Sequence, residues 1–216
     1  MKYSLVPLSE LSSEEIARLA ELHCRVMETL LRELGAAMVQ HYYEAAKTDA
    51  DSLGWIAKSP DGEILGWAMG SANPALLNRK LRQPAVFFVW QILTHPRAIG
   101  GLLRTMLSSS PANKLKTGEV ELTYIGLAES ARGKGLGQVL LLAFAKSARQ
   151  AGYTRLALSV ESDNLVAQRL YTRSGFQVKT SFREGRFERL RMQVELDALG
   201  KSAKSSPKNG SSAAIK

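Results

Sequence analysis

Cysteine and histidine are scarce in this sequence, and their scarcity argues against two kinds of chemistry. Cys24 is the one cysteine among 216 residues, so no disulfide can form within the chain, and a reducing compartment is favoured. The three histidines, His23, His41 and His95, show no metal-ligand spacing, and no CxxC or HExxH string occurs. We therefore expect a cytoplasmic protein without a metal site.

Long hydrophobic runs are also lacking. No stretch reaches the roughly 18 apolar residues that a membrane-spanning helix needs. Residues 1–10 lack the charged-then-apolar pattern of a secretion signal. The hydrophobic content of 45% and the charged content of 23% are ordinary for a globular protein. The sequence thus predicts neither a membrane span nor secretion.

Acidic residues are fewer than basic ones, and the formal net charge is +9. Four lysines lie in residues 200–216, a stretch rich in Ser, Lys, Ala and Gly without any acidic residue, which predicts a flexible basic tail. An anionic cofactor would account for part of the remaining +5. Basic residues are not interleaved with aromatic ones as in RNA-binding proteins, so we expect no nucleic-acid partner.

A glycine-rich hexapeptide stands between a strand-like run, Glu119–Leu127, and a helix-like run, residues 138–151. Its sequence is Arg132-Gly133-Lys134-Gly135-Leu136-Gly137. Alternate glycines let the backbone turn tightly and approach a ligand, because no Cβ shields the amides. The following helix adds unpaired N–H groups and the positive end of its dipole. The pattern predicts a site for a di- or polyphosphate, the alternative being a loop that merely begins a helix.

Two common nucleotide motifs do not fit this segment. A P-loop requires Gly, four residues and then Gly-Lys with Ser or Thr, and no such string occurs. A dinucleotide-binding turn requires Gly-x-Gly-x-x-Gly, but Gln138 occupies the last position when the count begins at Gly133. ATP held by a P-loop and NAD are therefore not expected.

A second motif follows a predicted strand at residues 156–160. Asp163 or Asn164 can cap a helix by accepting an early backbone N–H, and Gly175 can end that helix in the left-handed conformation. The helix would place four side chains on one face by its spacing of i, i+3, i+4 and i+7. These side chains are Ala167, Leu170, Tyr171 and Ser174.

Together the two motifs resemble the GCN5-related N-acetyltransferase (GNAT) family. The first fits Arg/Gln-x-x-Gly-x-Gly/Ala after a strand, and the second matches the family's later signature at Asn164, Ala167, Tyr171, Gly175 and Phe176. The resemblance implies an α/β fold with a mixed, mostly antiparallel central sheet flanked by helices. It also implies acetyl-CoA as co-substrate. The residues implied in binding it are Leu127, Arg132, Gly133, Lys134, Gly135, Leu136, Gly137 and Asn164.

The resemblance assigns chemical roles to two groups. A bulge in the strand before the glycine-rich segment would free a backbone N–H near Leu127 to polarise the thioester carbonyl. Tyr171 would lie near the thioester sulfur and act as general acid, since a phenol with a pKa of about 10 is protonated at neutral pH. The alternative for Tyr171 is a half-buried core aromatic. No nucleophile with a paired base is evident, which favours direct attack by the acceptor.

The general base is less firmly assigned by the sequence. Glu121 stands 11 positions before Arg132, the spacing at which some protein-acetylating members place their base. A carboxylate among apolar neighbours would have a raised pKa, which suits that role. Its alternative is a solvated glutamate at a strand edge. N-terminal-amine acetylating members carry a base glutamate where this chain has Ser159, so that assignment fails, and a water chain stays open.

One acetyltransferase domain is expected over residues 1–199, followed by the tail at 200–216. Its first half would contain a strand at 2–8, a helix that begins at Ser12 or Ser13, a helix at 30–46 and a hairpin about Pro60-Asp61-Gly62. Its last two strands would meet about Glu184-Gly185.

Residues 72–118 are longer than the connection in many relatives, and they form a helical insertion before the fourth strand. The apolar stretches 85–93 and 99–107 predict at least two helices in it. A helical hairpin packed on the core, a pocket wall, a dimer contact and a membrane-surface element all remain open for this insertion.

The function expected is transfer of acetyl from acetyl-CoA to the primary amine of a small molecule, such as an amino sugar or an arylalkylamine. Acetylation of a protein lysine or N-terminal amine is the first alternative, favoured by Glu121. A non-catalytic acyl-CoA sensor is the second. The sequence leaves the acceptor, the acyl-chain preference and the oligomeric state, including a homodimer, undetermined.

Overall fold

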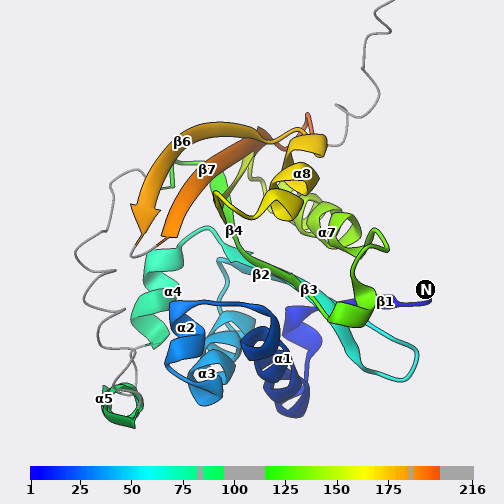
Figure 1. Cartoon of the computed structure of the whole chain (residues 1–216). Coiled ribbons are helices and arrows are strands. Elements are labelled where there is room, and N and C mark those ends of the chain that lie inside the picture. Colours follow the sequence, from blue (N-terminus) through cyan, green and yellow to red (C-terminus); the bar gives the residue numbers. More distant parts are fainter. Residues whose placement is uncertain (82–84, 95–114, 185–186, 200–216) are drawn as a thin grey trace, which may run out of the picture.

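A sheet of seven strands runs through the described part of the chain, which in this computed structural model comprises residues 1–81, 85–94, 115–184 and 187–199 (Figure 1). The strand order is β1-β2-β3-β4-β5-β7-β6. All neighbours pair antiparallel except β4 and β5, which are parallel. The strands are β1 (Ser4–Pro7), β2 (Ser52–Lys58), β3 (Ile64–Ser71), β4 (Glu119–Leu127), β5 (Arg155–Glu161), β6 (Gln177–Glu184) and β7 (Phe187–Glu195). The mixed, mostly antiparallel sheet predicted from the sequence is confirmed.

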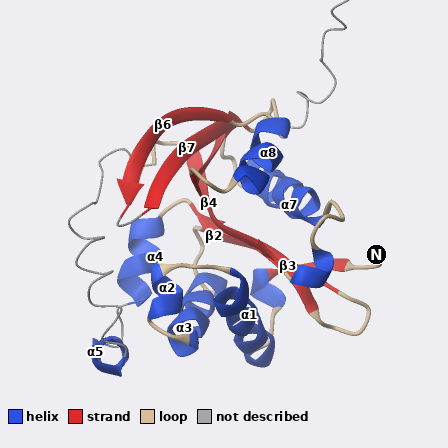
Figure 2. Ribbon diagram, viewed as in Figure 1, coloured by secondary structure: helices blue, strands red, loops and turns tan. Residues whose placement is uncertain are grey.

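Helices cover both faces of the sheet (Figure 2). One face carries α1 (Ser13–Val26), α2 (Leu30–Glu33) and α3 (Ala36–Lys47). The other carries α7 (Leu136–Gln150), with α8 (Leu165–Arg173) beside it. Each face has its own apolar core, because a two-sided sheet must bury both surfaces. Phe144 of α7 is fully buried in one core and Tyr43 of α3 in the other.

Most predicted boundaries follow from local signals. Ser12 caps α1 and forms a capping box with Glu15, as expected. Gly62 adopts a φ of 83° in the turn between β2 and β3, which explains the hairpin signal. The single helix predicted at 30–46 is wrong. Gly35 has a φ of 92° and separates α2 from α3, since that conformation cannot continue a right-handed helix.

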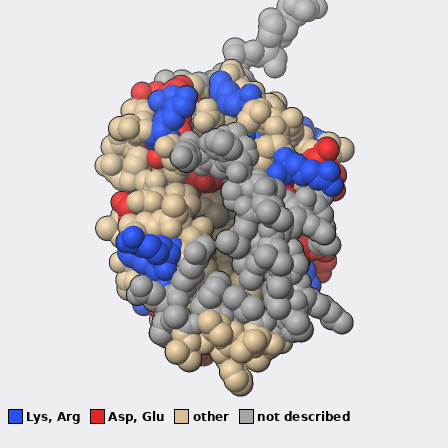
Figure 3. Space-filling view, turned by 90° about the vertical axis from the view of Figure 1, so that its left-hand side faces the viewer, with Lys and Arg blue, Asp and Glu red and all other residues tan. Residues whose placement is uncertain are grey.

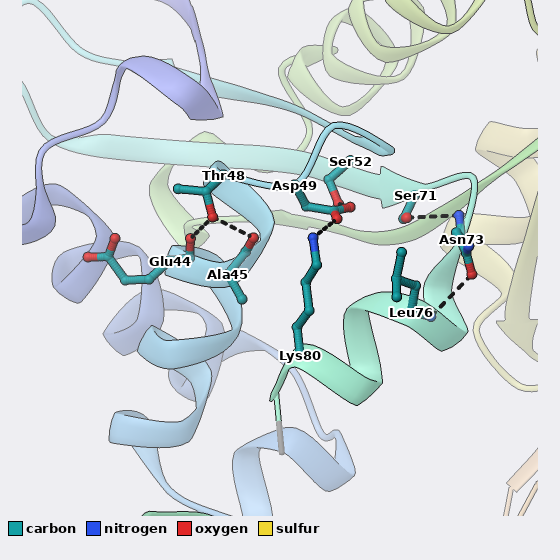
Figure 4. Close-up of polar contacts among 9 residues, drawn as sticks. All are labelled: Glu44, Ala45, Thr48, Asp49, Ser52, Ser71, Asn73, Leu76 and Lys80. Atoms are coloured by element: carbon teal, nitrogen blue, oxygen red, sulfur yellow. Dashed lines mark hydrogen bonds and ion pairs between the residues drawn. The ribbon is translucent and has the colours of Figure 1, made fainter. Parts of the chain in front are cut away.

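The insertion predicted before the fourth strand contains α4 (Pro74–Leu81) and α5 (Ala85–Thr94). The apolar stretch at 85–93 is helical as predicted, whereas α4 was not foreseen. Its signal was Asn73, whose Oδ1 accepts the Leu76 N–H at 3.1 Å, followed by proline at the first helical position (Figure 4). The helix predicted at 99–107, Gly185 of the last turn and the tail at 200–216 lie outside the described residues.

An ion pair attaches α4 to the core. The buried carboxylate of Asp49, just after α3, accepts a hydrogen bond from the Ser52 hydroxyl at 2.8 Å and pairs with the Lys80 ammonium at 2.5 Å (Figure 4). One carboxylate therefore joins the ends of α3 and α4 to the start of β2. Among the described helices, none combines the length and the apolar character needed to cross a membrane.

A neutral histidine lies in the core between the sheet and α1. His23 is fully buried, with Nδ1 2.8 Å from the Tyr43 hydroxyl and Nε2 3.0 Å from the Thr29 hydroxyl. Its ring stacks on Trp67 at 5.7 Å and meets Tyr124 edge-on at 4.9 Å. Burial, with the Arg32 charge as a smaller cause, lowers the pKa of His23 to about 4.

This depressed pKa predicts a loss of stability in mild acid. Between about pH 6.5 and pH 4 the unfolded chain binds a proton at His23 that the folded chain excludes, so the free energy of unfolding should fall by up to about 3 kcal/mol. His23→Gln, which cannot titrate, should flatten this dependence in urea denaturation at a series of pH values. An unchanged slope in His23→Gln would contradict the assignment.

Candidate active site

The parallel strands β4 and β5 pair over only part of their length. Their ladder runs from Glu119↔Arg155 to Leu122↔Leu158, yet β4 continues to Leu127 and β5 to Glu161. Beyond Leu122, β4 pairs on one side alone, with β3. The backbone N–H and C=O groups of residues 123–127 that point toward β5 therefore have no ladder partner there, and they are suited to hydrogen-bond an inserted ligand.

The predicted bulge in β4 exists, but it lies upstream of the expected position. Met69 pairs with Tyr124 and Gly70 with Leu122, which leaves Thr123 as the extra residue. From Tyr124 to Leu127 the ladder with β3 is regular. The bulge stands at the residue where β4 leaves β5, so it marks the separation of the strands. The polarising role of the Leu127 N–H remains a prediction.

The glycine-rich segment forms an open cradle before α7. Gly133 and Gly135 have φ values of 71° and 78°, in the left-handed region that favours glycine. A Cβ built on either residue would meet no atom within 4 Å. Gly135 is the N-cap of α7, and its carbonyl accepts the first backbone hydrogen bonds of the helix. The cradle thus presents free space next to unpaired helical N–H groups, which fits a phosphate group.

The side chains around the cradle divide into charged and buried ones. Arg132 and Lys134 are exposed, and the Lys134 ammonium donates to the Ser130 carbonyl at 2.7 Å. Leu136 is 1% exposed and packs in the core, so its contribution to binding would come from its backbone. Arg132 and Lys134 therefore place two positive charges at the rim of the cradle, and the buried Leu136 anchors the start of α7 in the core.

The two sequence motifs meet at the beginning of α7. A Cβ on Gly137 would lie 3.5 Å from Leu170 of α8 and 3.6 Å from Leu127 of β4. Leu127, ten residues before Gly137, and Leu170, 33 residues after it, therefore both lie close to the first turn of α7. The convergence brings the cradle next to the end of β4 and to the helix that carries Tyr171, as the resemblance implies.

Tyr171 is held between α8 and the core. It is 5% exposed, its ring centroid lies 5.6 Å from that of Phe176, and burial raises its pKa well above the ordinary value. Asn164 caps α8 by accepting the Ala167 N–H at 3.1 Å. Gln168, which sequence analysis missed, donates to the carbonyls of Glu161 and Ser162 and ties α8 to the end of β5.

A buried arginine, also missed in the sequence, bridges the strands where they separate. Arg191 of β7 is 3% exposed; one of its nitrogens pairs with the Glu121 carboxylate of β4 and lies 3.1 Å from the Ser159 hydroxyl of β5. Burial raises the pKa of Glu121, and Arg191 opposes that rise. Glu121 is therefore a desolvated carboxylate with a cationic partner. The contact joins three strands, and no local signal could indicate it.

The molecule is hollowed on the side where α4 and the β6–β7 pair lie. Figure 3 shows this hollow between the part that holds β6 and β7 and the part that holds α4, with acidic atoms at its upper edge. The basic side chains on this face form separate groups around it.

Solved structures similar to this one are acetyltransferases. An acetyltransferase from Salmonella typhimurium, solved with acetyl-CoA, matches with a TM-score of 0.59 over 97% of this chain and 99% of its own, at 17% identity. The PaiA N-acetyltransferase from Thermoplasma acidophilum, in complex with coenzyme A, matches with a TM-score of 0.57 over 90% and 99%, at 15% identity. At these identities the likeness establishes the fold.

Curated relatives share more sequence over shorter stretches. The mycothiol acetyltransferase of Jonesia denitrificans is 44% identical over 134 residues, which are 60% of this chain and 40% of the relative. That of Renibacterium salmoninarum is 37% identical over 78 residues, 36% of this chain and 22% of the relative. The chain therefore matches about two fifths or less of the length of these relatives.

The family model for acetyltransferases (GNAT) matches residues 17–176. This range spans most of the chain and includes most of α1, the cradle and the α8 motif. With the sheet, the separated strands and the converging motifs described above, it shows that the chain belongs to the acetyltransferase (GNAT) family.

Proposed function

We propose that this protein transfers an acetyl group from acetyl-CoA to the primary amine of a small molecule by direct attack. The observation that supports this most strongly is the convergence of Leu127, Gly137 and Leu170, which brings the cradle and Tyr171 to the open end of β4. A non-catalytic acyl-CoA sensor would require only the cradle, and it would have no use for a tyrosine placed beside the open end of β4.

The cradle is the proposed site for the phosphates of CoA. Backbone N–H groups of residues 133–137 would bind the pyrophosphate, with Arg132 and Lys134 adding charge at the rim. The β4 edge at residues 123–127 would bind amide groups of the pantetheine arm, because its β5-facing groups have no ladder partner there. In this arrangement the Leu127 N–H would polarise the thioester carbonyl. Asn164 would act by fixing the start of α8.

Tyr171 is the proposed general acid. Burial raises its pKa, so the phenol stays protonated at neutral pH and can donate a proton to the leaving thiolate. The same shift makes it unsuitable as a base. The acceptor amine must therefore lose the proton of its ammonium form to another group before it attacks the thioester. Glu121 is the proposed acceptor of that proton, directly or through water. Its raised pKa suits that task, while the Arg191 pair keeps it ionised.

The acceptor is proposed to be a small molecule that reaches the site through the hollow beside α4 and β7. The curated relatives are mycothiol acetyltransferases, so the compounds on which those enzymes act are the first acceptors to test. Amino sugars and arylalkylamines follow, in line with the apolar insertion. Acetylation of protein amines is the second candidate, because Glu121 stands at the spacing of protein-acetylating members.

Cofactor binding can be tested with two glycines at opposite ends of α7, the N-cap Gly135 and Gly152, which follows the C-cap. Gly135→Ala and Gly152→Ala both place a Cβ at a positive φ and in open space, so each should lose about 1–2 kcal/mol of stability. Gly135→Ala alone should weaken binding of CoA, by about tenfold or more in calorimetric titration, because its methyl fills the cradle. Equal effects of the two variants would argue against the cradle, and a folded wild type without affinity for acetyl-CoA would refute the proposed function.

The general acid can be tested with Tyr171→Phe. We expect the rate of thiol release with a working amine to fall about 100-fold or more, while the Kd for acetyl-CoA stays within a few-fold of wild type. Tyr153→Phe, at a half-buried tyrosine after α7, is the control and should keep full activity. An unchanged rate in Tyr171→Phe would remove this residue from the mechanism, and a wild type without turnover on any amine would favour the sensor.

The base can be tested through the pH dependence of the rate. If Glu121 must be ionised, activity falls as the pH drops through its pKa, and removal of the Arg191 charge should raise that pKa. Arg191→Gln should therefore move the acidic limb of kcat/KM to higher pH by about one unit, whereas Arg155→Gln, at the other end of β5, should not.

Glu121→Gln complements this test and should abolish the acidic limb together with most of the rate. A buried carboxylate that loses its cationic partner lowers the free energy of unfolding by about 3–5 kcal/mol. The folding of Arg191→Gln should therefore be checked by circular dichroism and compared with that of the double variant Glu121→Gln/Arg191→Gln. Full activity of Glu121→Gln would mean that a chain of water molecules, and not Glu121, accepts the proton of the acceptor ammonium.

A further inference from the structure

Helix α5 exposes four apolar side chains to solvent and buries the polar side chain of a glutamine. Val86, Val89, Trp90 and Leu93 are 81%, 52%, 62% and 68% exposed, whereas Gln91 is 7% exposed. The four apolar residues follow the spacing i, i+3, i+4 and i+7, so they form one continuous face of the helix. A helix at a water-exposed surface normally has the reverse arrangement. A contiguous apolar face of this kind marks an interaction surface.

The opposite face of α5 attaches the helix to the fold. Phe87 packs in the core beside α3, and its ring lies 5.2 Å from that of His41 in an edge-on contact. These contacts direct the exposed face away from α3. In Figure 1, α5 lies at the periphery, far from the sheet and from α7 and α8. The face is thus separate from the cradle.

The sequence around α5 is strongly basic. Residues 64–118 contain seven lysines or arginines and no aspartate or glutamate. The basic tail holds four further lysines, which leaves the rest of the chain with a net charge of −2. Among the described members of this segment, Arg79 and Lys116 are exposed, and Lys80 pairs with Asp49. Positive charge is therefore concentrated in the segment that carries the apolar face.

We propose that the α5 face, formed by Val86, Val89, Trp90 and Leu93, docks on an anionic phospholipid surface. A helix of ten residues is about 15 Å long, so it would lie in the plane of the interface. Apolar side chains with a tryptophan would enter the headgroup boundary, and exposed cations such as Arg79 of the preceding helix α4 would bind lipid phosphates. A second copy of the chain is a poorer occupant, because docking two α5 faces would bring two acid-free basic segments together.

The proposal is tested with the full chain and lipid vesicles. Wild type should float with vesicles of phosphatidylcholine mixed with phosphatidylglycerol, bind vesicles of phosphatidylcholine alone much less, and dissociate as salt is raised. Val89→Glu/Leu93→Glu should lower partitioning by about tenfold or more, since it places two charges at the interface. Val178→Glu, at a residue of β6 that is 53% exposed, is the matched control and should bind as wild type.

The same variants distinguish other occupants of the face. Affinity for CoA and the far-ultraviolet circular dichroism should be unchanged in Val89→Glu/Leu93→Glu, so a loss of vesicle binding cannot come from unfolding or from a damaged cradle. Absence of wild-type binding to anionic vesicles overturns the proposal. A wild-type dimer that Val89→Glu/Leu93→Glu converts to a monomer, measured by analytical ultracentrifugation, also overturns it and assigns the face to a second copy.

Discussion

The separation of β4 from β5 is the constraint on which the rest of the site depends. A parallel pair requires a crossover, and α7 supplies it, so the cradle at the start of α7 must lie at the carboxyl end of β4. Because the ladder stops at Leu122, the same end of β4 keeps unpaired backbone groups. The parallel pairing thus places the glycine-rich cradle, the proposed phosphate site, next to an open strand edge.

Arg191 connects the strands at the point where β4 and β5 separate. Its contacts with Glu121 and Ser159 connect β7, β4 and β5 at the end of the ladder, where backbone hydrogen bonds no longer do so. A buried ion pair contributes little net stability compared with apolar packing. Its position fits a role in the proposed site, because Arg191 opposes the rise in the pKa of a carboxylate close to the open edge.

Much of the fold and of the cradle could be predicted because their signals are local. The capping box at Ser12, the turn at Gly62 and the glycines at 133 and 135 each depend on residues a few positions apart. Prediction failed where packing decided the outcome. The break at Gly35 required a positive φ that the apolar periodicity of residues 30–46 concealed, and the bulge at Thr123 depends on its register with β3.

The sequence by itself determined the family resemblance, the phosphate cradle and the pattern of strands and helices, since each is encoded in short-range spacing. Only the tertiary structure brought Leu127 and Leu170 close to Gly137, paired Arg191 with Glu121 and exposed the apolar face of α5. The physical reason is that burial, register and the pKa shifts that follow from them arise from contacts between residues far apart in the chain, and no local spacing specifies those contacts.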